Sequence, residues 1–157
     1  MSEGPVILYV EDDPLQRRLC AMLLVRAGYE VTAAANAFEA WEELNSATFD
    51  LLVTDNEMQQ FTGLDLVVKA RAAGLALPII IASGSASLLD SPEYDWLKFS
   101  ARLQKPFDAN QLLATVQEVL GRDKKLPTTA SQDTASAHRL IQQCRSVKPH
   151  SDWGINE

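Results

Sequence analysis

The stretch VILYVEDDPLQRRLCAMLLVRAGYEVTA, residues 6–33, holds a complete strand–helix–strand pattern. Val6–Val10 is continuously apolar and rich in branched side chains, which is typical of a strand buried on both faces of a parallel sheet. Pro14–Ala27 is longer and amphipathic, and Gly28 stands where a helix ends in a left-handed residue. Tyr29–Ala33 is a second short apolar run. The pattern therefore predicts two strands joined by a helix. The apolar residues that the helical period places toward one side of this helix are Leu15, Leu19, Met22, Leu23 and Val25.

The same alternation continues as far as residue 121. Short apolar runs predict three more strands, at Phe49–Thr54, Pro78–Ala82 and Ala101–Leu103. Helical patterns and helix-start signals predict four more helices, at Asn36–Ser46, Gly63–Ala73, 92–99 and Asp108–Leu120, with a long loop over 84–91. Strict alternation with short connections favours parallel strands and right-handed crossovers. We therefore expect an α/β fold, a doubly wound sheet of five parallel strands with five helices on its two faces.

The composition describes an acidic globular protein. The chain has 157 residues, 46% of them hydrophobic, and a net charge of −7. It is too apolar for a wholly disordered chain, and it lacks the basic surplus of a protein that binds nucleic acid directly. No apolar run approaches the ~18–20 residues of a membrane span, and no secretory signal is recognisable. We expect a soluble, cytoplasmic protein that contacts neither membrane nor nucleic acid.

Charge separates the end of the chain from the rest. Residues 1–121 carry a net charge of −9, whereas residues 122–157 carry +2 and are rich in polar side chains, which is typical of a linker or tail. Within the tail, 134–147 is either a short amphipathic helix, which would cover the domain itself or form a homodimer, or merely a partly apolar stretch. The apolar residues at helical spacing there are Leu140, Ile141, Cys144 and Val147.

Polar side chains follow four of the five predicted strands. They are Glu11 and Asp12 after the first strand, Asp55 after the third, Ser83 after the fourth and Lys105 after the fifth. The carboxyl ends of the strands in a doubly wound sheet form the edge where ligands bind. Carboxylates held close together repel one another, and a hard cation such as Mg²⁺ relieves the repulsion. Acids, a metal, a hydroxyl and a lysine together favour phosphoryl transfer, which depends on positioning and charge neutralisation.

Residues 5–121 resemble the receiver domain of two-component response regulators. The motifs that carry the resemblance are Val-Glu-Asp-Asp-Pro at 10–14, Gly-Tyr-Glu-Val at 28–31, Asp-Leu-Leu-Val-Thr-Asp at 50–55, Met58 with Gly63-Leu64, Pro78, Ala82-Ser83-Gly84 and Lys105-Pro106-Phe107. They stand in the family's order and spacing. The resemblance implies a flavodoxin-like sheet with strand order 2-1-3-4-5, a receiver domain over 1–121 and a cis peptide bond before Pro106.

The resemblance also implies a role for each polar strand end. Asp55 would be the phosphoacceptor, Ser83 the switch hydroxyl that turns toward the aspartyl phosphate, and Lys105 the partner of the phosphoryl group. Mg²⁺ is the implied cofactor. Its ligands would be Asp12 directly, Glu11 through water, Asp55, and the backbone carbonyl of Glu57.

The implied function is a phosphorylation switch. A histidine kinase supplies a phosphohistidine, Asp55 accepts the phosphoryl group, and the face built from 92–99, 101–103 and 108–120 changes shape for a downstream protein. The chain would not be an enzyme in the usual sense, since it acts only on its own aspartate. Because 122–157 is too short for an output domain, we expect a single-domain regulator. The alternatives are a pseudo-receiver interaction module, a phosphate relay or sink, the detached receiver of a hybrid histidine kinase, and a flavin-binding protein, whose phosphate the acids after the first strand would repel.

Two departures from the family pattern bear on the switch. Arg102 occupies the position of the usual aromatic switch residue, so either Tyr94, Trp96 or Phe99 substitutes for it or the output is transmitted otherwise. Glu57, two residues after the acceptor, places an acid beside the cleft. We expect Glu57 to alter the lifetime of the phosphoryl group, in a direction that the sequence does not fix, so the dephosphorylation rate should change in Glu57→Asn.

Overall fold

The computed structural model describes residues 4–124, which form a sheet of five parallel strands. The strands are β1 (Val6–Val10), β2 (Glu30–Ala34), β3 (Leu51–Asp55), β4 (Ile79–Ser83) and β5 (Ala101–Gln104). Their order across the sheet is β2-β1-β3-β4-β5. The predicted α/β class, the doubly wound parallel sheet and its strand order are therefore confirmed.

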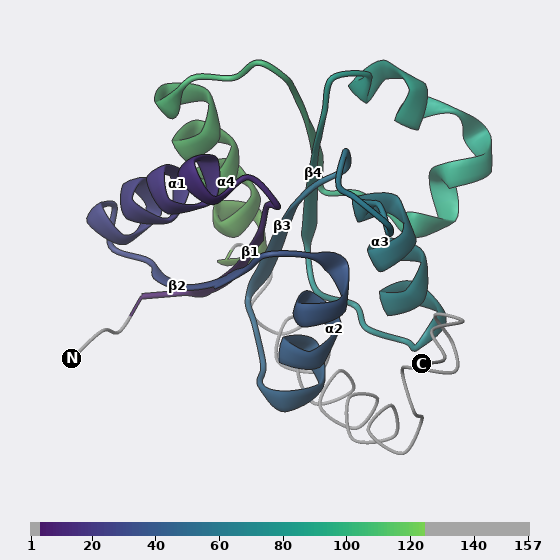
Figure 1. Cartoon of the computed structure of the whole chain (residues 1–157), viewed down its shortest axis with the longest axis horizontal. Helices are drawn as coiled ribbons and strands as arrows, with labels where there is room; N and C mark the ends of the chain where they lie inside the picture. The colour runs from purple at the N-terminus through teal and green to yellow at the C-terminus, as the bar shows by residue number, and fades with distance from the viewer. Residues whose placement is uncertain (1–3, 125–157) are drawn as a thin grey trace.

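The α-helices cover both faces of the sheet. They are α1 (Pro14–Arg26), α2 (Ala37–Ser46), α3 (Gly63–Ala72) and α4 (Ala109–Lys124). Helices α1 and α4 lie on one side of the sheet, and α2 and α3 lie on the other (Figure 1). The strand order reverses at β1, whose neighbours are β2 and β3, so the ends of β1 and β3 meet at the point where such folds bind ligands.

Each face of the sheet has its own hydrophobic core, because successive residues of a strand point to opposite faces. Ile7 and Tyr9 of β1 pack beneath α1 and α4, whereas Leu8 and Val10 pack beneath α2 and α3. The inner strands β3 and β4 are buried along their whole length. This burial explains why their sequences are continuously apolar, rather than alternating, up to the polar residues at their carboxyl ends.

The segment between β4 and β5 differs from the prediction of a loop over 84–91 and one helix over 92–99. The structure has two short 3₁₀ helices there, η1 (Ala86–Asp90) and η2 (Pro92–Leu97). Ser91 separates them with an extended backbone, φ −60° and ψ 141°, because proline disfavours helical geometry in the residue before it. The described residues thus contain four α-helices and two 3₁₀ helices instead of five helices.

Helix α4 is longer than predicted. It runs through Gly121, where we expected it to end, and continues to Lys124. A glycine inside a helix lowers its stability by only about 1 kcal/mol, so it does not have to end one. Residues 122–124 of the expected tail are therefore helical, and the helix expected at 134–147 lies outside the described residues.

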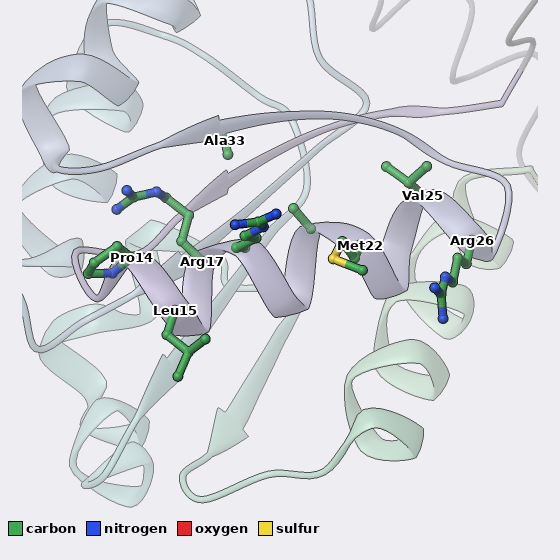
Figure 2. Close-up of a pocket in the computed structure, with 9 residues that line it drawn as sticks. Pro14, Leu15, Arg17, Met22, Val25, Arg26 and Ala33 are labelled. Carbon is green, nitrogen blue, oxygen red and sulfur yellow. The ribbon is translucent and has the colours of Figure 1, made fainter.

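Helix α1 turns most of its large apolar residues toward solvent, although an amphipathic helix of a globular protein usually packs its apolar side against the core. The exposed fractions are 66% for Leu15, 49% for Leu19, 43% for Met22 and 54% for Val25. The buried residues of α1 are instead Cys20 and Leu24. An apolar groove with basic residues runs along this face and reaches β2, and we call it the α1 groove (Figure 2). Its lining is Pro14, Leu15, Arg17, Arg18, Ala21, Met22, Val25, Arg26 and Ala33.

Among residues 4–124, no helix is long and apolar enough to cross a membrane.

Candidate functional site

The polar residues predicted at the strand ends come together at one edge of the sheet. Asp55 is the last residue of β3, and Ser83 is the last residue of β4. Glu11 follows β1 directly, and Lys105 follows β5 directly. Glu11, Asp55 and Ser83 are all buried, with exposed fractions of 3%, 3% and 1%. Polar groups withdrawn from water to this extent need partners close by.

Lys105 is the basic partner of this cluster. Its Nζ forms an ion pair with Asp55 Oδ1 and lies 4.0 Å from Glu11 Oε1. Burial acts to lower the pKa of Lys105, but the bond to Asp55 and the charges of the surrounding carboxylates together outweigh it and raise that pKa. The lysine therefore stays charged and faces the carboxylates.

The two buried carboxylates are harder to ionise than ordinary ones. Burial and the neighbouring Asp55 raise the pKa of Glu11 to about 7. Burial also raises the pKa of Asp55, although Lys105 opposes the shift. The single positive charge of Lys105 does not neutralise the carboxylates of Glu11, Asp12 and Asp55 at this edge of the sheet.

The acidic cluster fits a divalent cation. One carboxylate oxygen from each of Glu11, Asp12 and Asp55 can be chosen so that all three lie within 4.8 Å of one another. Glu11 Oε1 is buried and has no hydrogen-bond donor. A buried acceptor without a donor, beside other carboxylates, is satisfied by a hard cation such as Mg²⁺. The side chains predicted as metal ligands are therefore brought together, whereas the ligand role of the Glu57 carbonyl stays a prediction.

Contacts within the loop after β1 fix the acidic pair. The side chain of Glu11 accepts a hydrogen bond from the Asp13 backbone N–H at 3.2 Å, and Asp13 caps α1 by accepting from the Leu15 N–H at 3.1 Å. Arg17 Nη1 donates to the Glu11 carbonyl oxygen at 2.8 Å. The role of Arg17 was not predicted. Its place on the first turn of the helix that follows the acidic pair was the available signal.

Gly63 supports the acceptor from behind. The first residue of α3 lies so close to β3 that a Cβ atom there would be 2.3 Å from the Asp55 carbonyl oxygen and 3.0 Å from the Asn56 Cα. Asn56 completes the contact, since its carbonyl oxygen accepts from the Gly63 N–H at 3.0 Å and its side chain accepts from the Leu64 N–H at 2.9 Å. The Gly63-Leu64 pair thus holds the backbone that carries Asp55.

The side chain of Glu57 binds the end of β4. Its Oε2 accepts a hydrogen bond from the Ser83 hydroxyl at 2.5 Å, and its Oε1 accepts one from the Gly84 N–H at 2.9 Å. Loss of some hydration acts to raise the pKa of the Glu57 side chain, but its hydrogen bonds outweigh this effect and lower that pKa. Glu57 is therefore an ionised acceptor, a role that its position two residues after Asp55 did not reveal.

Gln104, the last residue of β5, holds the same loop from the other side. Its Nε2 donates to the Gly84 carbonyl oxygen at 2.7 Å, and its Oε1 accepts from the Ala86 N–H at 3.2 Å. Sequence reasoning missed this residue because a polar side chain at the end of a strand has many common uses.

Arg102 on β5 connects the sheet to η1. Its Nε donates to the Leu89 carbonyl oxygen at 3.2 Å and lies 3.1 Å from Asp90 Oδ1. The guanidinium also lies over the Phe99 ring, 5.2 Å from its centroid. An ionic contact therefore occupies the position where the family pattern has an aromatic ring. The cis peptide bond between Lys105 and Pro106 that the resemblance implied is present.

A comparison with models of protein families assigns the chain to one of them. The model of the response regulator receiver domain matches residues 7–117. The chain belongs to this family. Receiver domains are the phosphoacceptors of two-component systems rather than enzymes in the usual sense, and they interact with histidine kinases and downstream effectors.

Individual proteins agree with this assignment. The chain is 33% identical over 114 residues to the response regulator receiver protein CpdR of Brucella abortus. This match covers 73% of this chain and 95% of CpdR. It is 28% identical over 145 residues to the DNA-binding transcriptional regulator NtrC of Rhizobium meliloti; that match covers 92% of this chain but only 30% of NtrC.

Solved receiver structures are also similar. A CheY-like receiver domain protein from Methanospirillum hungatei superposes with a TM-score of 0.72 at 28% identity, covering 78% of this chain and 98% of that one. The response regulator TrrA from Thermotoga maritima, solved in complex with Mg²⁺-BeF, superposes with a TM-score of 0.65 at 29% identity. The match covers 73% of this chain and 98% of TrrA.

Proposed function

We propose that this receiver is a phosphorylation switch in which Asp55 accepts a phosphoryl group from the phosphohistidine of a histidine kinase. The observation that carries the proposal is the pairing of Asp55 with Lys105 inside a cluster of three carboxylates, of which Glu11 and Asp55 are buried. An acceptor oxygen, a cation beside it and a site for a metal are the parts that phosphoryl transfer needs.

In the transfer, an Asp55 carboxylate oxygen attacks the phosphorus of the phosphohistidine. The new O–P bond forms as the N–P bond breaks, and the imidazole nitrogen keeps the electron pair and takes up a proton. Lys105, which already faces Asp55, neutralises charge on the phosphoryl oxygens. Mg²⁺, when bound, supplies further charge neutralisation, and Glu11, Asp12, Asp55 and the Glu57 carbonyl would hold it. Attack by water on the acyl phosphate resets the switch.

The α1 groove supports a kinase as the donor. It begins at Pro14 and Leu15, two to three residues after Asp12, so a protein seated on it lies beside the acidic cluster. Its exposed apolar residues give a partner helix a surface to bury, and its arginines favour an acidic partner. We assign the binding site of the downstream protein to the face formed by η1, η2, β5 and α4. Arg102 joins β5 and η1 there.

Phosphorylation by a small donor tests the proposal without a kinase. Acetyl phosphate with Mg²⁺ should add the mass of one phosphoryl group to the wild-type chain. Asp55→Asn should gain nothing. Asp95→Asn, the same change on the exposed side of η2, should gain as much as wild type. A wild-type chain that binds Mg²⁺ but never gains mass would instead be a pseudo-receiver, and the proposal would be wrong.

A further inference from the structure

The Ser83 hydroxyl has a single donor hydrogen, which is already engaged in a hydrogen bond. Ser83 Oγ donates to Glu57 Oε2 at 2.5 Å and accepts from the Ser85 N–H at 3.0 Å. A hydroxyl carries a single donor hydrogen. Ser83 therefore cannot donate to a phosphoryl oxygen on Asp55 while it donates to Glu57.

The Glu57 side chain binds the backbone of Gly84 as well as the hydroxyl of Ser83. Its second oxygen accepts from the Gly84 N–H at 2.9 Å, while Gln104 binds the Gly84 carbonyl oxygen at 2.7 Å from the opposite side. The peptide units on both sides of Gly84 are thus fixed at the point where β4 leads into η1. The first of these bonds ends on a carboxylate, and such bonds are stronger than those between neutral groups.

We propose that the side chain of Glu57 is a positioning residue that holds Ser83 and Gly84 in the unphosphorylated arrangement by competing with the phosphoryl group for the Ser83 hydroxyl proton. The inference rests on the proposed function, since it needs a phosphoryl group on Asp55 as the competitor. Each phosphorylation event must break the Glu57–Ser83 bond before Ser83 can bind the phosphoryl oxygen. Glu57 thereby opposes the phosphorylated arrangement and sets how strongly phosphorylation shifts the loop.

Glu57→Gln is the informative change. It keeps the shape of the side chain, but Ser83 and Gly84 donate to different oxygens of the carboxylate, and an amide has an acceptor oxygen at only one of these two positions and an NH₂ donor at the other. Glu57 is exposed, so the substitution does not disturb the core. Because the change also removes a negative charge near the site, it is made in the wild-type chain and in Ser83→Ala, which separates the hydroxyl's contribution from a general charge effect.

The probe is beryllofluoride at saturating Mg²⁺, titrated into the ¹⁵N-labelled chain and followed by the Gly84 amide signal. We expect Glu57→Gln to tighten beryllofluoride binding about tenfold when Ser83 is present, as one charge-assisted hydrogen bond predicts, and less than threefold in Ser83→Ala. In the absence of the probe, the Gly84 amide signal should move upfield in Glu57→Gln, because it loses its carboxylate acceptor.

Equal tightening in the two backgrounds, or no tightening in either, would overturn the competition. Failure of the proposed function has a different signature. In that case the wild-type chain neither binds beryllofluoride nor accepts a phosphoryl group, whereas the upfield shift of Gly84 in Glu57→Gln persists.

Discussion

Glu11 shows how one buried carboxylate couples this site to stability. Its pKa of about 7 in the folded chain lies above its ordinary value of 4.5. Between these two values the folded state binds more protons than the unfolded state, so stability falls as pH rises through this window. The full penalty, on the order of 3 kcal/mol, is present above pH 7.

We therefore expect Glu11→Gln to stabilise the metal-free chain at pH 8 and to change its stability little at pH 4. Urea unfolding in the presence of EDTA measures the difference. Mg²⁺ should stabilise wild type more than the variant, because the ion compensates the charge that the variant lacks. Glu42→Gln, at an exposed position on α2, is the matched control and should follow wild type at both pH values. Parallel curves for wild type and Glu11→Gln would contradict this account of the cluster.

Gly63 makes a second prediction at the scale of a single residue. A methyl group there would sit 2.3 Å from the Asp55 carbonyl oxygen, so Gly63→Ala must displace the backbone that carries the acceptor. We expect it to lower the free energy of unfolding by roughly 2 kcal/mol or more and to slow phosphorylation by acetyl phosphate.

Gly84→Ala provides the comparison for Gly63→Ala. The nearest atom to its new methyl group is Glu57 Oε1 at 3.9 Å, an ordinary contact. Its effect on unfolding should stay below about 1 kcal/mol. If the two variants unfold at the same urea concentration, close packing behind Asp55 is not what positions it.

At the scale of single elements, helix α1 is the surface on which the kinase prediction depends. Met22 lines the α1 groove and is 43% exposed. Met22→Lys should reduce phosphotransfer from any histidine kinase that phosphorylates the wild-type chain by tenfold or more, because it places a charge in an apolar contact. Phosphorylation by acetyl phosphate should be unchanged, since that donor needs no docking surface.

The matched control for Met22→Lys is Val68→Lys. Val68 is 38% exposed on α3, across the sheet from α1. It should leave both kinds of phosphorylation unchanged. If Met22→Lys impaired acetyl phosphate equally, the groove would act on the site itself rather than on a partner.

The elements also show where sequence reasoning reached its limit. The inner strands were predictable because burial on both faces leaves a continuous apolar run, as in β3 and β4. Helix α1 was harder, because apolar residues occupy several of its sides and periodicity alone did not select Cys20 and Leu24 as the buried ones. The 3₁₀ geometry of η1 and η2 depends on local hydrogen bonding around Ser91-Pro92, which a hydrophobic pattern does not record.

For the molecule as a whole, the position of the site follows from topology. Strict alternation of strands and helices predicts parallel strands, whose carboxyl ends all lie at one edge of the sheet. The structure brings Glu11, Asp55 and Lys105 together at this edge. The side-chain partners were not predictable in the same way. The bonds of Glu57 to Ser83 and of Gln104 to Gly84 join residues 26 and 20 positions apart, and only the folded loops bring those pairs together.

In this receiver the phosphoryl group should arrive on Asp55 itself and should require the metal that the acidic cluster accommodates. The most direct measurement treats the chain with acetyl phosphate, reduces the product with borohydride and sequences its peptides by mass spectrometry. Reduction turns an aspartyl phosphate into homoserine and so marks the modified residue. We predict homoserine at position 55 alone, and only when Mg²⁺ is present. Homoserine at another aspartate, or equal labelling in EDTA, would show that Asp55 and its metal site are not where the phosphoryl group is transferred.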